Sequence, residues 1–88
     1  MPNSYLKVTY RRGRPFAAYL YLTRRSGDAV ARSREEGDGL VVDYSADGRP
    51  LGIEVTDPAL ASVQRINSLL QRLHMEALPP ADLQPICS

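Results

Sequence analysis

The chain has 88 residues, of which 43% are hydrophobic, and its 11 basic and 10 acidic side chains give a formal net charge of +1. This length suits a single domain spanning residues 1–88, and the hydrophobic content argues against a disordered chain. The near balance of charges provides no strong overall field for an anionic polymer or an anionic membrane. We therefore expect neither nucleic acid nor a membrane as the main partner.

The cysteine count and the lengths of the apolar runs further limit the classes of protein that the sequence fits. Cys87 is the single cysteine, so it cannot close an internal disulfide, and no Cys/His cluster suggests a zinc site. No stretch approaches the roughly 18 apolar residues of a membrane-spanning helix. The first residues also lack a signal-peptide core. We expect a cytoplasmic protein with no cofactor.

Three segments in the first half of the chain have strand character. Residues 5–10 alternate in polarity, and residues 16–23 are rich in Leu, Tyr and Ala, so both are predicted strands. Residues 11–15 between them contain Gly and Pro, which predicts a turn. A weaker third strand is predicted at residues 29–35.

The strongest hairpin signal lies in the middle of the chain. Residues 40–44 and 51–55 alternate in polarity and flank an Asp47-Gly48 turn. A two-residue loop there predicts three facing pairs on one side of the sheet. These pairs are Leu40 with Val55, Val42 with Ile53, and Tyr44 with Leu51.

A helix is predicted over residues 58–74, followed by a Pro-containing tail at residues 75–88. Asp57 is the expected cap, and Pro58 is tolerated in a first helical turn. Apolar residues recur at steps of three and four, which indicates one buried stripe. The stripe consists of Leu60, Val63, Ile66, Leu70 and Leu73. The apolar tail residues Leu78, Leu83 and Ile86 could dock on the chain itself or on a partner.

These elements predict an α+β fold: an antiparallel β-meander of four to five strands, over about residues 5–55, packed on one C-terminal helix. Alternation along the strands assigns the large aliphatic side chains to the face under the helix. The opposite face is expected to be the interaction face, because it carries several tyrosines. Its residues are Tyr5, Tyr19, Tyr21, Val41 and Glu54, with Asp43 beside them.

The stretch from Val30 to Ala59, VARSREEGDGLVVDYSADGRPLGIEVTDPA, resembles a small bacterial family known as domain of unknown function 2283. The pattern over roughly residues 6–60 comprises Tyr10, Tyr19, Leu20, Leu22, Asp43, Asp47, Gly48, Gly52, Ile53 and Glu54. Its most specific part is DG-x-x-x-GIE. The resemblance implies a sheet-plus-helix fold, no established activity and an antitoxin-like role. The chain departs from the pattern at Arg-Arg-Gly-Arg-Pro, where the family usually has an acidic turn.

One motif suggests a metal site. Asp43, Ser45, Asp47 and Glu54 match the oxygen-donor spacing of an EF-hand calcium loop, with Gly48 at its turn. An EF-hand needs a helix on each side, whereas these flanks alternate as strands. We favour the hairpin and keep a calcium or small-ligand site as the alternative.

Two arginine clusters are expected at opposite ends of the meander. Arg11, Arg12 and Arg14 form the first, and the acidic turn at residues 35–38 should lie beside it. Arg24 and Arg25 form the second, which should lie near Asp47. Local neutralisation is the favoured interpretation, with weak nucleic-acid binding through arginines and tyrosines as the alternative.

No segment indicates catalysis. The serines lack a GxSxG setting, His74 has no second histidine or cysteine nearby, and no glycine-rich phosphate loop is present. We therefore expect a non-enzymatic protein-interaction module that self-associates, as a homo-oligomer, or binds a small partner protein. An antitoxin-like role is its most specific form.

Overall fold

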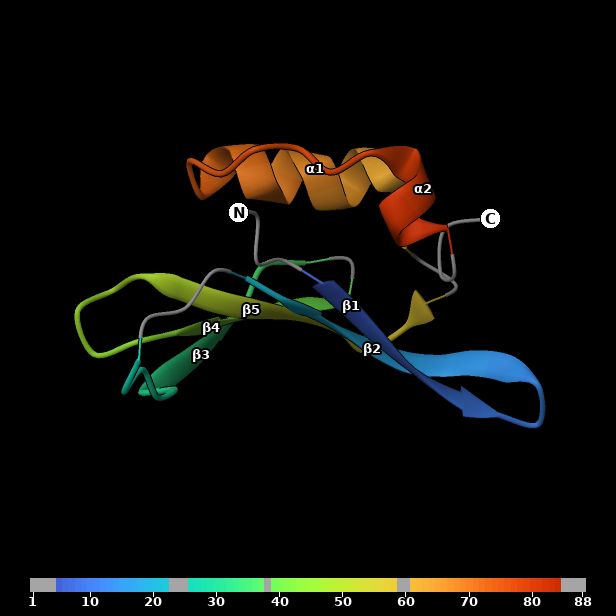
Figure 1. The fold of residues 1–88 in the computed structure, drawn as a ribbon, viewed down its shortest axis with the longest axis horizontal. Coiled ribbons are helices and arrows are strands. Elements are labelled where there is room, and N and C mark those ends of the chain that lie inside the picture. Colours follow the sequence, from blue (N-terminus) through green and yellow to red (C-terminus); the bar gives the residue numbers. More distant parts are fainter. Residues whose placement is uncertain (1–4, 23–25, 38, 59–60, 85–88) are drawn as a thin grey trace.

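The computed structural model describes residues 5–22, 26–37, 39–58 and 61–84, which form a sheet with helices on one side (Figure 1). The elements are β1 (Tyr5–Arg11), β2 (Arg14–Tyr21), β3 (Arg32–Glu35), β4 (Leu40–Tyr44), β5 (Pro50–Val55), α1 (Val63–Arg72) and α2 (Pro80–Leu83). The predicted α+β class is confirmed. Neither described helix has the length and apolar character needed to span a membrane.

The order of the strands differs from a meander. The sheet runs β1-β2-β5-β4-β3, with every neighbouring pair antiparallel. The prediction that β3 follows β2 in the sheet is wrong. All four residues of β3 are exposed, whereas β5 is mostly buried. The apolar β5 therefore takes the central position, because burial there removes more apolar surface from water, and β3 becomes an edge.

The predicted β4–β5 pairing is confirmed over most of its length. Leu40 pairs with Val55 and Val42 with Ile53, but the register shifts after Asp43, so that Tyr44 pairs with Pro50 instead of Leu51. This register shift follows from the length of the loop between β4 and β5. The Ser45 N–H donates to the Arg49 carbonyl over 2.9 Å, which encloses three residues instead of two. Gly48 takes a left-handed φ of 89°, as the last residue of such a loop commonly does.

Helix α1 begins later than predicted. Ser62, not Asp57, is its N-cap, and the Ser62 hydroxyl accepts a hydrogen bond from the Arg65 N–H over 3.0 Å. Pro58 lies before the helix, and its carbonyl accepts a hydrogen bond from the Ala61 N–H over 3.1 Å. A serine with extended backbone satisfies the first free amides of the helix as well as an aspartate does. Leu60, expected in the apolar stripe, lies outside the described residues.

The C-terminal end of α1 matches the predicted position near His74. The His74 N–H donates to the Gln71 carbonyl over 3.0 Å, and the Met75 N–H donates to the Leu70 carbonyl over 2.9 Å. His74 has a left-handed φ of 61°. This pair of bonds is the Schellman ending, which satisfies free helix carbonyls and turns the chain back.

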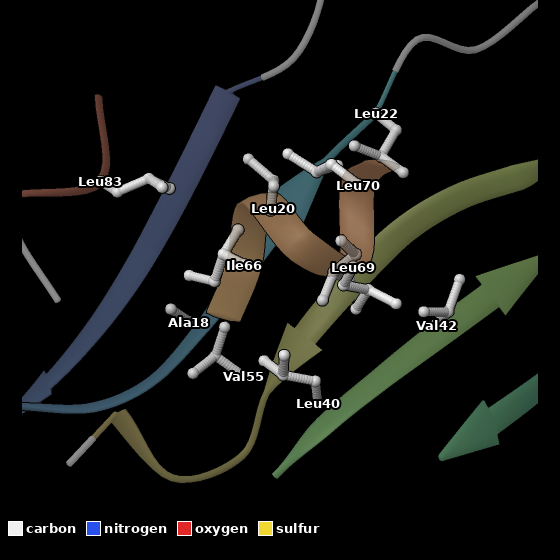
Figure 2. Packing of buried hydrophobic residues seen from close by; sticks show 11 residues of the cluster. Ala18, Leu20, Leu22, Leu40, Val42, Val55, Ile66, Leu69, Leu70 and Leu83 are labelled. Carbon is white, nitrogen blue, oxygen red and sulfur yellow. The ribbon is translucent and has the colours of Figure 1, made fainter. Parts of the chain in front are cut away.

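The tail docks on its own chain. Leu83 of α2 is fully buried in the core cluster and extends toward β1 (Figure 2). The Asn67 side chain of α1 holds the preceding segment through both backbone groups of Leu78, donating over 3.0 Å and accepting over 2.8 Å. Ile86 lies outside the described residues. The sequence alone had left this docking open.

The core fills the space between α1 and one face of the sheet (Figure 2). Helix α1 contributes Ile66, Leu69 and Leu70, of which Leu69 was not in the predicted stripe. The sheet contributes Ala18, Leu20, Leu22, Leu40, Val42, Ile53 and Val55. Alternation sends the neighbours of these residues to the opposite face, which no described element covers (Figure 1).

Candidate functional site

The candidate site is the uncovered side of the sheet, here called the open face. It comprises Tyr5, Lys7, Tyr19, Tyr21, Ser33, Glu35, Val41, Asp43, Gly52 and Glu54, which alternate with core residues along the five strands. All five residues predicted for the interaction face lie there. The fold thus brings residues far apart in sequence onto one surface.

Three tyrosines form a cluster at the β1–β2 side of the open face. Tyr5 and Tyr21 face each other across the two strands, and their rings stack with centroids 4.5 Å apart and planes 11° apart. Tyr19 meets Tyr21 edge-on, with centroids 4.7 Å apart. Tyr5 remains 59% exposed. The cluster is therefore ordered by ring contacts, with Tyr5 exposed and Tyr19 and Tyr21 half-buried.

Tyr19 reaches across the central strand. Its hydroxyl donates to Asp43 Oδ2 on β4 over 2.7 Å, although β5 lies between the two strands. The ring crosses β5 at Gly52, where an added methyl group would overlap both the ring and the hydroxyl. A glycine in the middle of a strand is a known signal of close approach by another group. Sequence reasoning noted Gly52 only as part of the family pattern.

Asp43 also accepts a hydrogen bond from the opposite side. The Ser33 hydroxyl of β3 donates to Asp43 Oδ1 over 2.5 Å. Tyr5, Tyr21, Tyr19, Asp43 and Ser33 therefore form a continuous row of contacts across the sheet, here called the open-face row. Ser33 was not among the predicted site residues, because its pairing with Asp43 depends on the register of β3.

Charge is distributed unevenly over the open face. Lys7 lies on edge strand β1, whereas Glu54, Asp43 and Glu35 lie on β5, β4 and β3. Lys7, Glu54 and Glu35 are exposed. The face is therefore basic at the β1 edge and acidic over β5, β4 and β3, a pattern that favours a partner with the opposite order of charge.

The residues of the alternative calcium site do not converge. Asp43 is engaged by Tyr19 and Ser33 on the open face, and Glu54 is exposed on the same face. Ser45 is 4% exposed and lies in the β4–β5 loop with Asp47. Within the described part of the chain, no three His, Cys, Asp or Glu side chains group as metal ligands.

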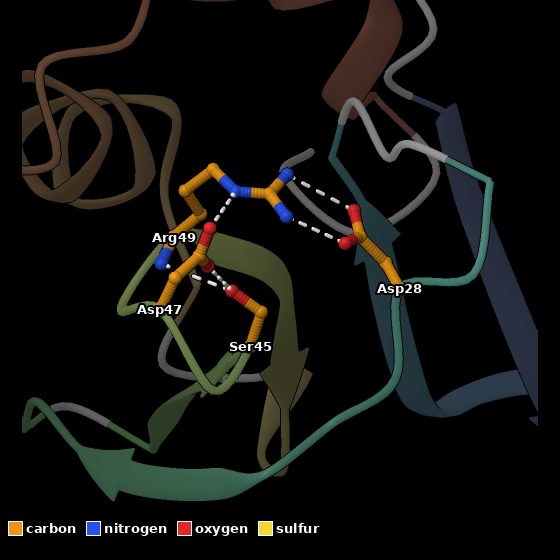
Figure 3. Close-up of polar contacts among 4 residues, drawn as sticks. All are labelled: Asp28, Ser45, Asp47 and Arg49. Atoms are coloured by element: carbon orange, nitrogen blue, oxygen red, sulfur yellow. Dashed lines mark hydrogen bonds and ion pairs between the residues drawn. The ribbon is translucent and has the colours of Figure 1, made fainter.

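Asp47 instead belongs to a polar clasp that also contains Ser45, Arg49 and Asp28 (Figure 3). The Arg49 guanidinium donates to both Asp28 oxygens, over 3.0 and 2.6 Å, and through Nε to Asp47 over 2.9 Å. The Ser45 hydroxyl donates to Asp47 Oδ1. This bond, followed by those from Arg49, lowers the pKa of Asp47 to about 2. The clasp ties the segment before β3 to the β4–β5 loop.

The predicted neutralisation of the first arginine cluster is wrong. Glu36 lies 3.7 Å from Arg34 and 3.8 Å from Arg72, and it accepts a bond from Tyr44. Burial, and then the negative charge of Glu36, raises the pKa of Tyr44. Because two strands separate β2 from β3, the acidic turn does not adjoin the β1–β2 turn. The second cluster, Arg24 and Arg25, lies outside the described residues.

Fold and site together define the class of protein: a small α+β protein with one helix-covered and one open sheet face. A family model described as Protein of unknown function (DUF2283) matches residues 17–57, and the chain resembles that family over these residues. The match includes Tyr19, Ser33, Asp43 and Gly52, so it covers the open-face row from β2 to β3. No curated protein and no solved structure matches the chain.

Proposed function

We propose that the chain is a non-enzymatic interaction module that pairs with a second copy of itself through the open face. The observation that supports this most directly is the stacked tyrosine cluster, with Tyr5 exposed, on a sheet face that no described element covers. Tyrosine is enriched at protein interfaces, where its ring buries a large area while its hydroxyl keeps a polar partner.

Preorganisation supports the same function. Tyr19 is held by Asp43, and Tyr21 lies between the Tyr5 and Tyr19 rings. Side chains that are already ordered lose little conformational entropy when a partner covers them. The open-face row therefore suits a flat partner surface, and sheets pack face to face at about 10 Å when their side chains interdigitate.

The charge pattern favours a second copy as that partner. A two-fold axis parallel to the strands would bring β1 of one copy over the β3–β5 side of the other. Lys7 of each copy would then approach Glu54 or Glu35 of its partner. An unrelated small protein, including the toxin of an antitoxin-like pair, is the competing partner, and it would use the same tyrosines.

The oligomeric state in solution tests this proposal. Sedimentation equilibrium at several concentrations should give a mass that rises from one chain to two. The double variant Tyr5→Ser and Tyr21→Ser should remain a folded monomer at concentrations where the unaltered chain is dimeric, because the ring cluster is lost. Tyr19 is left intact in this variant, since it also bonds within the sheet.

A control variant makes the result specific. Gln64→Ser changes an exposed residue of α1 on the opposite side of the molecule, and it should leave the mass unchanged. If the unaltered chain is a monomer at every concentration, or if the tyrosine variant dimerises equally well, self-association through the open face is refuted. A one-to-one complex with a different small protein would then support the competing partner.

A further inference from the structure

The β1–β2 hairpin extends beyond the rest of the sheet. Strand β2 pairs with β5 only from Ala18 to Tyr21, so the part of the hairpin nearer its turn pairs only with itself. Four residues of strand correspond to an extension of about 13 Å. Figure 1 shows this turn at one end of the long axis, beyond the helices. Residues 10–16 are here called the hairpin tip.

The hairpin tip concentrates positive charge. Arg12 and Gly13 both have left-handed φ values, 53° and 77°, as a two-residue hairpin loop requires. This loop sets Arg11 directly opposite Arg14. Like charges facing each other across two strands destabilise a hairpin. The arrangement is unfavourable for folding alone, and an anionic ligand would relieve it.

No acidic side chain of the described residues compensates this charge. Arg11, Arg12 and Arg14 form no ion pair with another described residue. The acidic residues beside β3 are three strand spacings from β2, a lateral distance of about 14 Å. That distance exceeds the Debye length of about 8 Å at physiological ionic strength. The acidic residues beside β3 therefore do not neutralise the hairpin tip.

Two exposed aromatic rings accompany the arginines. Tyr10 is 57% exposed and Phe16 is 53% exposed. The Arg11 guanidinium carbon lies 5.4 Å from the centre of the Phe16 ring, within range of a cation–π contact. A surface hollow of about 570 Å³ is lined by Arg11, Arg12, Arg14, Pro15 and Phe16. It combines guanidinium donors with an aromatic ring.

We propose that the hairpin tip binds single-stranded nucleic acid. The arginines would contact backbone phosphates, for which the guanidinium group is well suited, and the bases would stack on Phe16 and Tyr10. Phosphate contact alone would not distinguish single strands from duplex. Stacking on exposed aromatic rings does distinguish single strands from duplex, because unpaired bases offer free faces. This site is separate from the open face and does not depend on self-association.

Salt-dependent binding is the first test. Fluorescence anisotropy should detect binding of a labelled oligothymidine to the full chain. Three phosphate contacts predict a loss of roughly 20-fold in affinity between 50 and 200 mM salt, from a slope of about −0.7 per contact. The variant Arg11→Gln, Arg12→Gln and Arg14→Gln should lose most of this slope. The corresponding triple Arg→Lys variant should keep the slope, since it keeps the charges.

Matched variants separate the site from total charge and from folding. Arg34→Gln, Arg65→Gln and Arg72→Gln together remove the same charge from exposed positions elsewhere, and should leave affinity within about threefold of the unaltered chain. Phe16→Ser should weaken single-strand binding by about tenfold. Melting temperatures confirm that each variant is folded.

Three results would overturn the proposal. The first is an absence of salt-dependent binding to the oligothymidine. The second is an equal loss of affinity in the control arginine variant, which would indicate non-specific attraction. The third is binding to a duplex of equal length that is tenfold tighter than to the single strand, since stacking could not then be the basis of recognition.

Discussion

Gly52 lacks a side chain at the point where the Tyr19 ring crosses β5. Gly52→Ala should force Tyr19 away and break its bond to Asp43, destabilising the fold by about 1–3 kcal/mol. Urea unfolding measures this directly. In a Tyr19→Ser background the same substitution should have a much smaller effect, because the overlap is gone. Equal effects in the two backgrounds would show that Tyr19 is not the reason for the glycine.

Asp47 provides a prediction on pH dependence. Its folded pKa of about 2 lies below the ordinary value of 3.8. A lowered pKa means that the ionised carboxylate stabilises the fold, fully above about pH 5 and progressively less as pH falls toward 2. Melting temperature should therefore fall over this range, and the Asp47→Asn variant should show a smaller fall. An identical acid profile in both proteins would contradict a stabilising role for the ionised Asp47.

At the scale of elements, α2 depends on the core for its existence. A helix of four residues is not stable in isolation, so its conformation must come from packing. Leu83→Ala should destabilise the fold by about 2–4 kcal/mol, because it leaves a cavity between α2 and the sheet. Asp82→Ala, at the neighbouring exposed position, is the control and should change stability by less than about 0.5 kcal/mol. Similar values for both would mean that the tail does not contribute to the core.

Strands were easier to predict than their order. Alternation identified β1, β2, β4 and β5, since the period of two is a local property of the sequence. Strand order depends on which surfaces are buried after distant segments meet. The exposed sequence of β3 contains no local signal that moves it to the edge, beyond its lack of apolar residues.

The start of α1 illustrates another limit of local reasoning. Asp57-Pro58 and Ser62 both satisfy the local rules for a helix N-terminus. In the structure the helix begins after Ser62. The choice between the two caps depends on the distance that the chain must span between the end of β5 and the core. This distance is set by the tertiary structure.

At the scale of the whole molecule, the distribution of charge over the open face makes a prediction about assembly. Lys7→Glu should weaken the proposed dimer roughly three- to tenfold, because the basic edge becomes acidic. Adding either Glu54→Lys or Glu35→Lys should restore affinity by exchanging the two charges, since Lys7 approaches one of these carboxylates in the proposed dimer. Sedimentation equilibrium measures all of these variants. Failure of both added substitutions to restore the dimer would contradict the proposed two-fold arrangement.

The net charge of the chain does not indicate that positive charge is concentrated at the hairpin tip. A net charge of +1 argued against an anionic partner, and the predicted meander placed the acidic turn beside the three arginines, whereas the observed strand order separates them. Averages over composition carry no information on where charges lie. The same reasoning applies to the calcium motif, whose oxygen donors match in sequence but point into different environments.

The sequence by itself determined the strands, the two faces of the sheet, the apolar stripe of the helix and the family resemblance. Each follows from alternation, helical periodicity or a short motif, all of which are local. Only the tertiary structure decided the strand order, the docking of the tail, the clasp at Arg49 and the row from Tyr5 to Ser33. Those features join segments distant in the chain, and their free energy depends on burial and register that exist only once the sheet has assembled.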